Sequence, residues 1–460
     1  MIRVFNHYLH RRTLVQIFFD LGLIVFAIVG IVLMKTDGEA LAVPLATTHG
    51  LSLAAGIFVI NSASGFYQPA HHRSLTQSLA RAVLALLLAL LLAYGIFSFL
   101  PDFARGQDVI KAAAMTLVFA VMLHRVYTAH SSSQSRTGSK ILIFGSGAVA
   151  SLVGKTLKHA DPHANIVGYF PGPNEEQPEV PHTEVLSAQA SLIDTALMHG
   201  IDEIVVALSE RRGGSMPLRQ LLDCKIKGIR VVDIATYFEK TLGQINVNHV
   251  NAGWLIFGDG FNQGAVRTFI KRVFDIVCST LMIVLAAPIM LVTAVAIWFE
   301  SHGPVLYRQE RVGANGKSFN VVKFRSMRTD AEEDGKPRWA TANDDRVTRI
   351  GKFIRKVRID ELPQLFTVLK GEMSLVGPRP ERPYFVDELT REIPYYAVRH
   401  SVKPGVTGWA QVRYQYGATM EDSIEKLQYD LYYVKNHTLF LDLVVMFETV
   451  AVVLTGKGAR

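Results

Sequence analysis

Long apolar stretches dominate the beginning of the chain. Four of them follow one another with short polar loops between: Leu14 to Met34, Gly50 to Phe66, Leu79 to Leu100 and Val109 to Tyr127. The first and third are the strongest, since about 20 apolar residues are needed to cross the hydrocarbon core of a bilayer. Basic residues precede the first stretch, lie in the second loop and follow the fourth stretch, which places these three segments in the cytoplasm. Residues 1–130 are therefore predicted to form four transmembrane helices.

A cleaved signal peptide is the alternative for the first stretch. His10, Arg11 and Arg12 precede it, and the small-residue run Ala40-Leu41-Ala42 follows it. The apolar run is longer than the roughly 7 to 15 residues that are usual in a signal peptide, which favours a retained helix.

The pattern changes after a polar tract, residues 131–140, that is typical of a linker. Short strands are expected at Ile141–Phe144, Ile166–Phe170, Ile204–Leu208 and Ile229–Asp233, with helical stretches between them. Strands that alternate with helices predict a parallel sheet. Residues 141–250 are therefore predicted to form a Rossmann-like α/β domain.

The turn after the first of these strands reads FGSGAVA, so Gly145 and Gly147 have the spacing of a dinucleotide-binding turn. They are the candidate cofactor-binding residues, because a helix N-terminus favours phosphate. The acid that should end the second strand is missing, since Phe170 is followed by Pro171 and Gly172. A dinucleotide in this domain is therefore doubtful, and the alternative is a tight strand-to-helix turn that binds none.

A fifth apolar run, from Ile276 to Phe299, contains no charged residue and is long enough to span a bilayer. Positive charge flanks both of its ends, which conflicts with a straight crossing. Pro288 lies in the middle of the run, where its missing N–H favours a kink. Residues 265–300 are thus either a helix that re-enters the membrane and returns to the same face or an ordinary kinked spanning helix, and the pattern alone leaves both open.

Two further segments are predicted to be helices at the membrane surface. From Ile350 to Val357, apolar residues recur at helical spacing while basic residues fill the remaining arc. Such a helix suits an anionic membrane, although a soluble helix packed on its own sheet has the same pattern. The apolar tail that starts at Leu439 is short and is interrupted by Asp442 and Glu448, so an interfacial helix is expected there.

Two adjacent acids, Asp360 and Glu361, follow the basic helix. Leu362 precedes Pro363 and is biased away from helical dihedrals, so either acid could cap a second helix that has Pro363 in its first turn. The surrounding cations favour a different role, because carboxylates beside phosphate-binding cations can bring Mg²⁺ and a phosphorylated substrate together. The candidate cations are Lys323, Arg325, Arg355, Arg379 and Arg382.

The composition agrees with a chain that lies partly in lipid. Hydrophobic residues make up 49% and charged residues 19%, against roughly 25% charged in soluble domains. The formal net charge of +8 suits anionic headgroups or phosphorylated substrates, but no block of Lys and Arg interleaved with aromatic residues indicates nucleic acid. The two cysteines, Cys224 and Cys278, argue against a disulfide framework and a zinc site.

The last part of the chain carries an ordered set of motifs: KRVFDI, GPVLYRQERVG, GKSFNVVKFRSM, RIDELPQLFTVLKGEMSLVGPRPERP, VKPGVTGWAQV and YDLYYVKN. Together with the proline-broken apolar run, they resemble the bacterial sugar transferase family of monotopic phosphoglycosyl transferases, from about Lys271 to Ala459. The four predicted spans and the α/β domain are similar to the long members of that family. The resemblance implies a monotopic α/β catalytic domain with interfacial helices at residues 301–460, and it favours the re-entrant form of the helix around Pro288.

The resemblance also implies an activity. Such an enzyme moves a hexose-1-phosphate, with glucose or galactose as our expectation, from a UDP-sugar to undecaprenyl phosphate and so initiates exopolysaccharide or O-antigen repeat units. Asp360 would attack the phosphorus attached to the sugar, release UMP and form a phosphosugar-aspartate intermediate. Glu361 would join Asp360 in holding Mg²⁺, and Asp430 of YDLYYVKN is a further candidate for substrate binding.

The resemblance further implies a location and partners. The chain would be a multi-pass protein of the bacterial inner (cytoplasmic) membrane with its catalytic domain on the cytoplasmic face. Membrane lipids are further expected partners, a second copy of the chain is a possible one, and nucleic acid is not expected.

Two other classes of protein would share part of this organisation. A membrane-bound nucleotide-sugar dehydratase or epimerase would need a Tyr-x-x-x-Lys pair for proton transfer, and the chain contains none. A non-catalytic regulator of polysaccharide assembly would not need an acid pair among cations.

Overall fold

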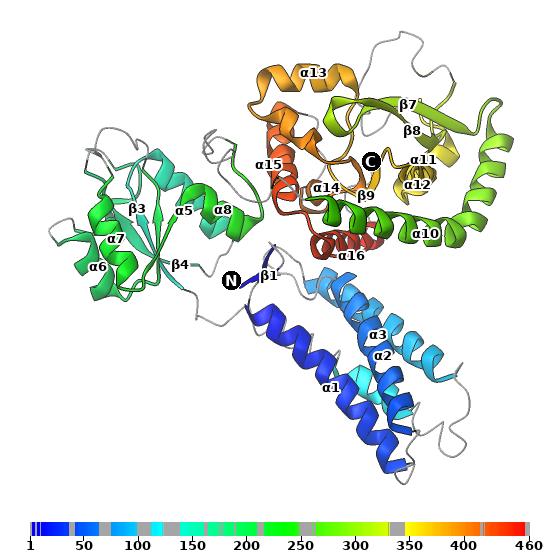
Figure 1. Ribbon diagram of the computed structural model, residues 1–460, viewed down its shortest axis with the longest axis horizontal. Coiled ribbons are helices and arrows are strands. Elements are labelled where there is room, and N and C mark those ends of the chain that lie inside the picture. Colours follow the sequence, from blue (N-terminus) through cyan, green and yellow to red (C-terminus); the bar gives the residue numbers. More distant parts are fainter. Residues whose placement is uncertain are drawn as a thin grey trace. The chain divides into compact units, whose positions relative to one another are not determined.

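The fold is given by a computed structural model of the whole chain. It describes residues 2–4, 7–9, 11–35, 42–63, 75–98, 112–121, 123, 139–160, 164–173, 175, 178–187, 190–208, 216–247, 261, 264–329, 331, 346–414, 417 and 419–455. The chain divides into two compact units (Figure 1). One consists of Met1–Leu9 with Gly243–Arg460, and the other of His10–Leu242.

The second unit begins with helices at the four predicted apolar stretches: α1 (Arg11–Lys35), α2 (Ala42–Ala63), α3 (Leu75–Ser98) and a described helix at Ala112–Val121. Apolar residues of all four pack into one buried cluster, and others such as Phe18, Phe26 and Leu91 are exposed on the outside. The described apolar segments of these helices are shorter than a full span. Four membrane crossings therefore stay a prediction.

A parallel sheet follows in the same unit. Its strands are β3 (Lys140–Phe144), β4 (Asn165–Phe170), β5 (Glu203–Val206) and β6 (Arg230–Asp233), in the order β4-β3-β5-β6. They begin and end within two residues of the expected strands. The connecting helices are α5 (Ala148–Ala160), α6 (Leu192–His199), α7 (Leu218–Ile226) and α8 (Ile234–Leu242), with a 3₁₀ turn η2 at His182–Glu184.

Helices cover both faces of this sheet (Figure 1). Ile141 and Ile143 of β3 pack in one buried cluster with residues of α5 and α8, while Leu142 and Phe144 pack in another with residues of α6 and α7. Successive strand side chains point to opposite faces, and both faces are covered, so Ile141 to Phe144 are all apolar while Lys140 at the start of β3 is exposed. The expected parallel sheet with alternating helices is thus present, and a Rossmann-like domain stays a prediction.

The other unit contains a short hairpin of β1 (Ile2–Val4) and β2 (His7–Leu9) and the long helix α10 (Gly264–Glu300). Among the described residues, α10 is the one helix long and apolar enough to cross a membrane. It has 37 residues with Pro288 inside it, and Figure 1 shows it as two limbs that run in different directions.

Both ends of α10 contact the same unit. Near its start, Arg272 donates hydrogen bonds of 2.6 Å to the carbonyls of Val368 and Leu369. At its end, Glu300 accepts a 3.1 Å bond from the backbone N–H of Ile350. A straight helix of this length would extend roughly 55 Å, so the bend brings both ends onto one folded body.

The rest of this unit is built from short elements. Strands β7 (Leu306–Val312) and β8 (Ser318–Phe324) are antiparallel, and β9 (Ser374–Val376) and β10 (Gly405–Thr407) are parallel. The helices are α11 (Arg349–Lys356), α12 (Gln364–Lys370), α13 (Pro383–Glu392), α14 (Trp409–Arg413), α15 (Met420–Asn436) and α16 (Leu439–Thr455), with 3₁₀ turns η3 (Ala314–Gly316), η4 (Ile359–Glu361) and η5 (Tyr396–Ser401).

The acids of the apolar tail point into the unit. Asp442 of α16 pairs with Lys271 of α10 at 2.8 Å, and Glu448 pairs with Arg413 of α14 at 2.7 Å. Lys271 also contacts Asp275 at 3.1 Å. The pairs of Asp442 and Glu448 fasten α16 to α10 and α14, and the placement of α16 at a membrane interface stays a prediction.

The segment that precedes α10 also belongs to this unit. Trp409 donates from Nε1 to the carbonyl of Gly243 at 2.8 Å, and the N–H of Ile245 donates to the carbonyl of Gln428 at 3.0 Å. Ile245 and Val247 are buried. Residues 243–247 are therefore a docked segment that covers α14 and α15.

Candidate active site

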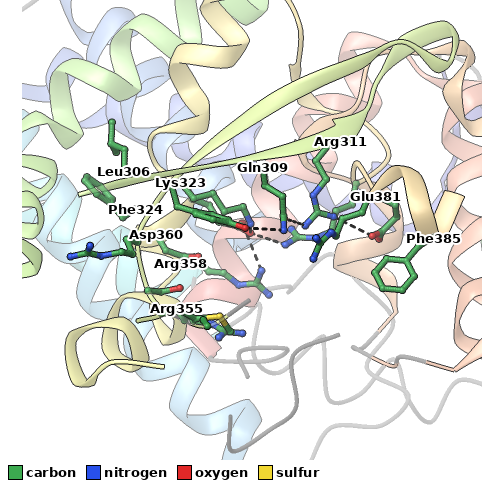
Figure 2. A pocket seen from close by; sticks show the side chains of 18 of the residues that line it. Leu306, Gln309, Arg311, Lys323, Phe324, Arg355, Arg358, Asp360, Glu381 and Phe385 are labelled. Carbon is green, nitrogen blue, oxygen red and sulfur yellow. Dashed lines mark hydrogen bonds and ion pairs between the residues drawn. The ribbon is translucent and has the colours of Figure 1, made fainter. Parts of the chain in front are cut away.

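A cavity of about 520 Å³ lies between β7, β8, η4, the loop after β9, η5 and α15 (Figure 2). Its volume is within the range of small-molecule sites. All eight residues predicted as catalytic or substrate-binding in the last part of the chain line it: Lys323, Arg325, Arg355, Asp360, Glu361, Arg379, Arg382 and Asp430.

The two acids lie in the 3₁₀ turn η4 and cap no helix. Pro363 is the N-cap of α12 and no side chain accepts a capping hydrogen bond there, so the capping alternative is wrong. Leu362 has helical dihedrals (φ −55°, ψ −36°), contrary to the bias expected before proline. The chain reverses one turn earlier, at Arg358, whose left-handed φ of 60° is uncommon for a residue other than glycine.

Cations hold the side chain of Glu361. Its Oε1 accepts hydrogen bonds from Lys323 at 3.1 Å and Arg379 at 2.8 Å, and Arg358 lies 3.8 Å from Oε2. Burial alone would raise the pKa of Glu361. The charges of Arg379, Lys323 and Arg358 outweigh burial and hold this pKa well below its ordinary range. Glu361 is therefore ionised and fixed in place.

Asp360 is in the opposite situation. It is 8% exposed, and within the described part of the chain its carboxylate makes no hydrogen bond or ion pair. Burial, followed by the negative charge of Glu361, raises its pKa from 3.8 to about 6. The charges of Lys323, Arg379 and Arg355 offset part of that rise. The carboxylate is thus available for chemistry in the cavity.

Arg325 has a different environment from Lys323. Its guanidinium donates to the carbonyl of Ser301 at 2.7 Å, to the hydroxyl of Ser301 at 2.8 Å and to the carbonyl of His302 at 3.2 Å. These groups follow the last residue of α10. Arg325 lines the cavity, but these hydrogen bonds engage its guanidinium at the exit of α10.

Asp430 lines the cavity and also holds a cation there. Its Oδ2 accepts hydrogen bonds from Arg399 at 3.0 and 2.7 Å. Arg399 also donates to the hydroxyl of Tyr396 at 2.7 Å and to the carbonyl of Arg379 at 2.9 Å. Asp430 therefore positions Arg399, which in turn holds the backbone of Arg379 beside Glu361.

Sequence reasoning missed Arg399 and a row of side chains on β7. Arg311 donates to Gln309 at 2.6 Å, and Gln309 donates to the hydroxyl of Tyr307 at 3.3 Å (Figure 2). Arg311 also pairs with Glu381 at 3.3 Å. The period of two along LYRQERV indicated that Tyr307, Gln309 and Arg311 share a strand face. No comparable local signal marks Arg399.

The glycine turn of the other unit is shaped by backbone packing. Gly145 has φ 134°, and a Cβ there would lie 2.5 Å from the carbonyl oxygen of Ala207. The N–H of Ser146, which a phosphate would use, donates at 2.5 Å to Glu175, and Glu175 also accepts from Gly172 at 3.2 Å. Gly147 precedes α5 in this turn. A carboxylate of the chain thus occupies the anion position, and the turn does not fit a dinucleotide.

Comparison with known proteins finds one matching family and several relatives of the chain. Residues 266–456 match the bacterial sugar transferase family. The UDP-N-acetylgalactosamine-undecaprenyl-phosphate N-acetylgalactosaminephosphotransferase of Aeromonas hydrophila is 46% identical over 242 residues, which are 53% of this chain and 56% of that protein. The UDP-glucose:undecaprenyl-phosphate glucose-1-phosphate transferase of Klebsiella pneumoniae is 38% identical over 276 residues, 59% of this chain and 58% of that protein.

A third relative, from Caulobacter vibrioides and with the same name as the Klebsiella protein, is 45% identical over 193 residues, 41% of this chain and 71% of that protein. The chain spans little more than half the length of the Aeromonas and Klebsiella relatives. Every residue of the cavity lies inside the matched range of residues 266–456. The chain belongs to the bacterial sugar transferase family.

Proposed function

We propose that this chain is a phosphoglycosyl transferase that moves a hexose-1-phosphate from a UDP-sugar to undecaprenyl phosphate, and so initiates exopolysaccharide or O-antigen repeat units. The names of its relatives contain both kinds of substrate. The observation that carries the proposal is the state of Asp360, a buried carboxylate without a hydrogen-bond partner among the described residues, in a cavity lined by arginines.

In the first step an oxygen of Asp360 attacks the phosphorus that bears the sugar. The bond between this phosphorus and the bridging oxygen breaks, its electron pair leaves with UMP, and a phosphosugar-aspartate forms. Lys323, Arg355 and Arg379 stabilise the negative charge on the phosphoryl oxygens. Glu361 does not compete as a nucleophile, because Lys323 and Arg379 engage its Oε1.

In the second step an oxygen of undecaprenyl phosphate attacks the same phosphorus. The bond to Asp360 breaks, and the carboxylate is regenerated. Two successive displacements at one phosphorus let both substrates use the same cations. Asp430 and Arg399 contribute by holding Arg379 in position.

The residues present fit a magnesium ion. Asp360 has unengaged oxygens, and Oε2 of Glu361 has only the distant Arg358 as an ion-pair partner, at 3.8 Å. The described residues contain no group of three or more His, Cys, Asp or Glu side chains that could hold a metal alone. One or two carboxylates suffice for Mg²⁺ when phosphates supply other ligands. When bound, the ion would neutralise part of the diphosphate charge.

The proposal includes a membrane location. We propose that α10 enters and leaves the same, cytoplasmic, face of the bacterial inner membrane, and that the helices of the other unit make the chain multi-pass. The contacts of Arg272 and Glu300 with one folded unit, and Pro288 between them, support the re-entrant form. The exposed apolar side chains of α10, among them Phe269 and Leu285, support burial in lipid.

Replacing Asp360 tests the function. With a UDP-sugar and undecaprenyl phosphate, Asp360→Asn should release UMP at least about 1,000-fold more slowly, because the nucleophile is lost. Asp387→Asn, a matched change on the exposed side of α13, should leave the rate unchanged. Mass spectrometry after incubation with the UDP-sugar alone should find the sugar phosphate on Asp360. UMP release at the normal rate by Asp360→Asn would show that the covalent mechanism is wrong.

A further inference from the structure

The cavity has two chemically different ends, and β7 runs from one to the other. At one end Pro304, Leu306, Tyr307 and Phe324 present apolar groups. The other end is polar and aromatic, with Arg311, Glu381, Arg382, Phe385 and Tyr396. Figure 2 shows Leu306 and Phe324 on one side, Glu381 and Phe385 on the other, and Lys323 between them. The five-residue step from Leu306 to Arg311 corresponds to roughly 17 Å of strand.

The apolar end continues into the contacts of the long helix. Phe324 lines the cavity and also packs in a buried cluster with Ile297 of α10 and Ile354 of α11. Leu306 lies directly opposite Phe324 in the β7–β8 pair. Leu306 and its neighbour Tyr307 are 44% and 42% exposed. Apolar surface thus reaches from the rim of the cavity to the last turns of α10, where Trp298 and Phe299 are exposed.

Cations adjoin this apolar rim. Tyr307 is the register partner of Lys323, so the backbone of the lysine that contacts Glu361 lies one strand spacing from the backbone of Tyr307. Arg355 lines the same cavity from α11. Its positive charge offsets part of the rise in the pKa of Asp360. An apolar surface followed within one strand spacing by cations fits an amphiphile with a hydrocarbon chain and a phosphate head. A UDP-sugar has no apolar chain and gains nothing from Leu306.

We infer that the rim formed by Pro304, Leu306 and Tyr307 is the subsite for the first isoprene units of the polyprenyl phosphate acceptor. The acceptor phosphate then lies at Lys323 and Arg355 beside Asp360, and the nucleotide of the donor occupies the Arg311 end. This inference rests on the proposed function and adds to it that the two substrates enter from opposite ends of one cavity. Only the second step of the reaction uses the rim.

A pair of leucine variants tests the subsite. Leu306→Ser removes the rim side chain, and Leu443→Ser removes a leucine of α16 that is 39% exposed and does not line the cavity. The first step is measured as exchange of labelled UMP into the UDP-sugar without acceptor. The second is measured as KM for undecaprenyl phosphate and for a ten-carbon prenyl phosphate.

Leu306→Ser should raise KM for both acceptors by about five-fold, as expected for losing burial of part of a leucine, and should leave the exchange rate unchanged. Leu443→Ser should change neither quantity. An unchanged KM in Leu306→Ser, an exchange rate that falls with it, or a loss confined to the long acceptor would overturn the assignment. Absence of UMP exchange in the unaltered protein would instead show that the proposed covalent function is wrong.

Discussion

At the scale of single residues, the site is defined by two adjacent acids in opposite states. Cations satisfy Glu361, whereas Asp360 is buried and has no partner among the described residues. An ionised carboxylate without hydrogen bonds is costly to bury, and the raised pKa of Asp360 expresses that cost. Such a group is unfavourable for stability and well suited to attack phosphorus.

The first consequence is a dependence of rate on pH. In the substrate-free enzyme the pKa of Asp360 is raised to about 6. The reactive ionised form of its carboxyl therefore predominates above pH 6 and is lost below it. We expect kcat/KM for the UDP-sugar to be level near pH 8 and to fall about ten-fold per pH unit well below 6. Initial rates of UMP release between pH 5 and pH 8 check this. A level profile over that range would contradict it.

The second consequence concerns stability. The pKa of Asp360 is higher in the folded chain than its ordinary 3.8, so the folded state is penalised when the group is ionised, and the penalty fades as pH falls toward 4. A pKa raised to about 6 corresponds to roughly 3 kcal/mol. Asp360→Asn should therefore raise the free energy of unfolding above pH 6 by up to this amount, and the gain should disappear near pH 4.

Glu361→Gln is the matched comparison and should act in the opposite direction. It leaves Lys323 and Arg379 without their anionic partner, so the free energy of unfolding should fall by about 2 kcal/mol at pH 7. Denaturant unfolding of both variants at pH 7.5 and pH 4.5 measures the two effects. A stability loss in Asp360→Asn at pH 7.5 would show that this carboxylate has a stabilising partner.

At the scale of elements, the sequence predicts what depends on local periodicity. The strands of the parallel sheet and the basic helix α11 were predictable because their apolar positions recur with periods of two and 3.6. Helix α8 was missed because it begins at Ile234, directly after β6 ends at Asp233, with no loop to mark it. The reversal at Arg358 was missed because a left-handed arginine has no sequence signature.

What could be predicted of the site was likewise limited to what the local sequence shows. The eight predicted residues do line one cavity, since charge and motif spacing brought them to attention. The roles of Arg325 and Asp430 could not be predicted, because each depends on a partner distant in the sequence. Arg325 bonds to Ser301, and Asp430 bonds to Arg399. Residue type shows what a side chain can bind, and tertiary contacts decide what it does bind.

At the scale of the whole molecule, the folded unit that carries the site begins upstream of the range that matches the bacterial sugar transferase family, residues 266–456. The family match begins at residue 266, whereas the compact unit resumes at Gly243. The docked segment, residues 243–247, lies in that difference. Its buried Ile245 and Val247 and its bond to Trp409 make it part of the same core.

This difference sets where a shortened protein should begin. A fragment of residues 243–460 keeps the docked segment, and a fragment of residues 261–460 loses it and leaves Trp409 without the carbonyl that its indole N–H contacts. We expect the shorter fragment to unfold at a lower denaturant concentration, with a loss of at least about 2 kcal/mol from the missing apolar burial. Equal midpoints for the two fragments in the same detergent would show that residues 243–247 contribute nothing.

A boundary drawn at the start of the family match, residue 266, would therefore separate the docked segment from the hydrophobic core of this unit. Recombinant versions for crystallisation or assay should start before Gly243, so that the side chains of α14 and α15 keep their cover.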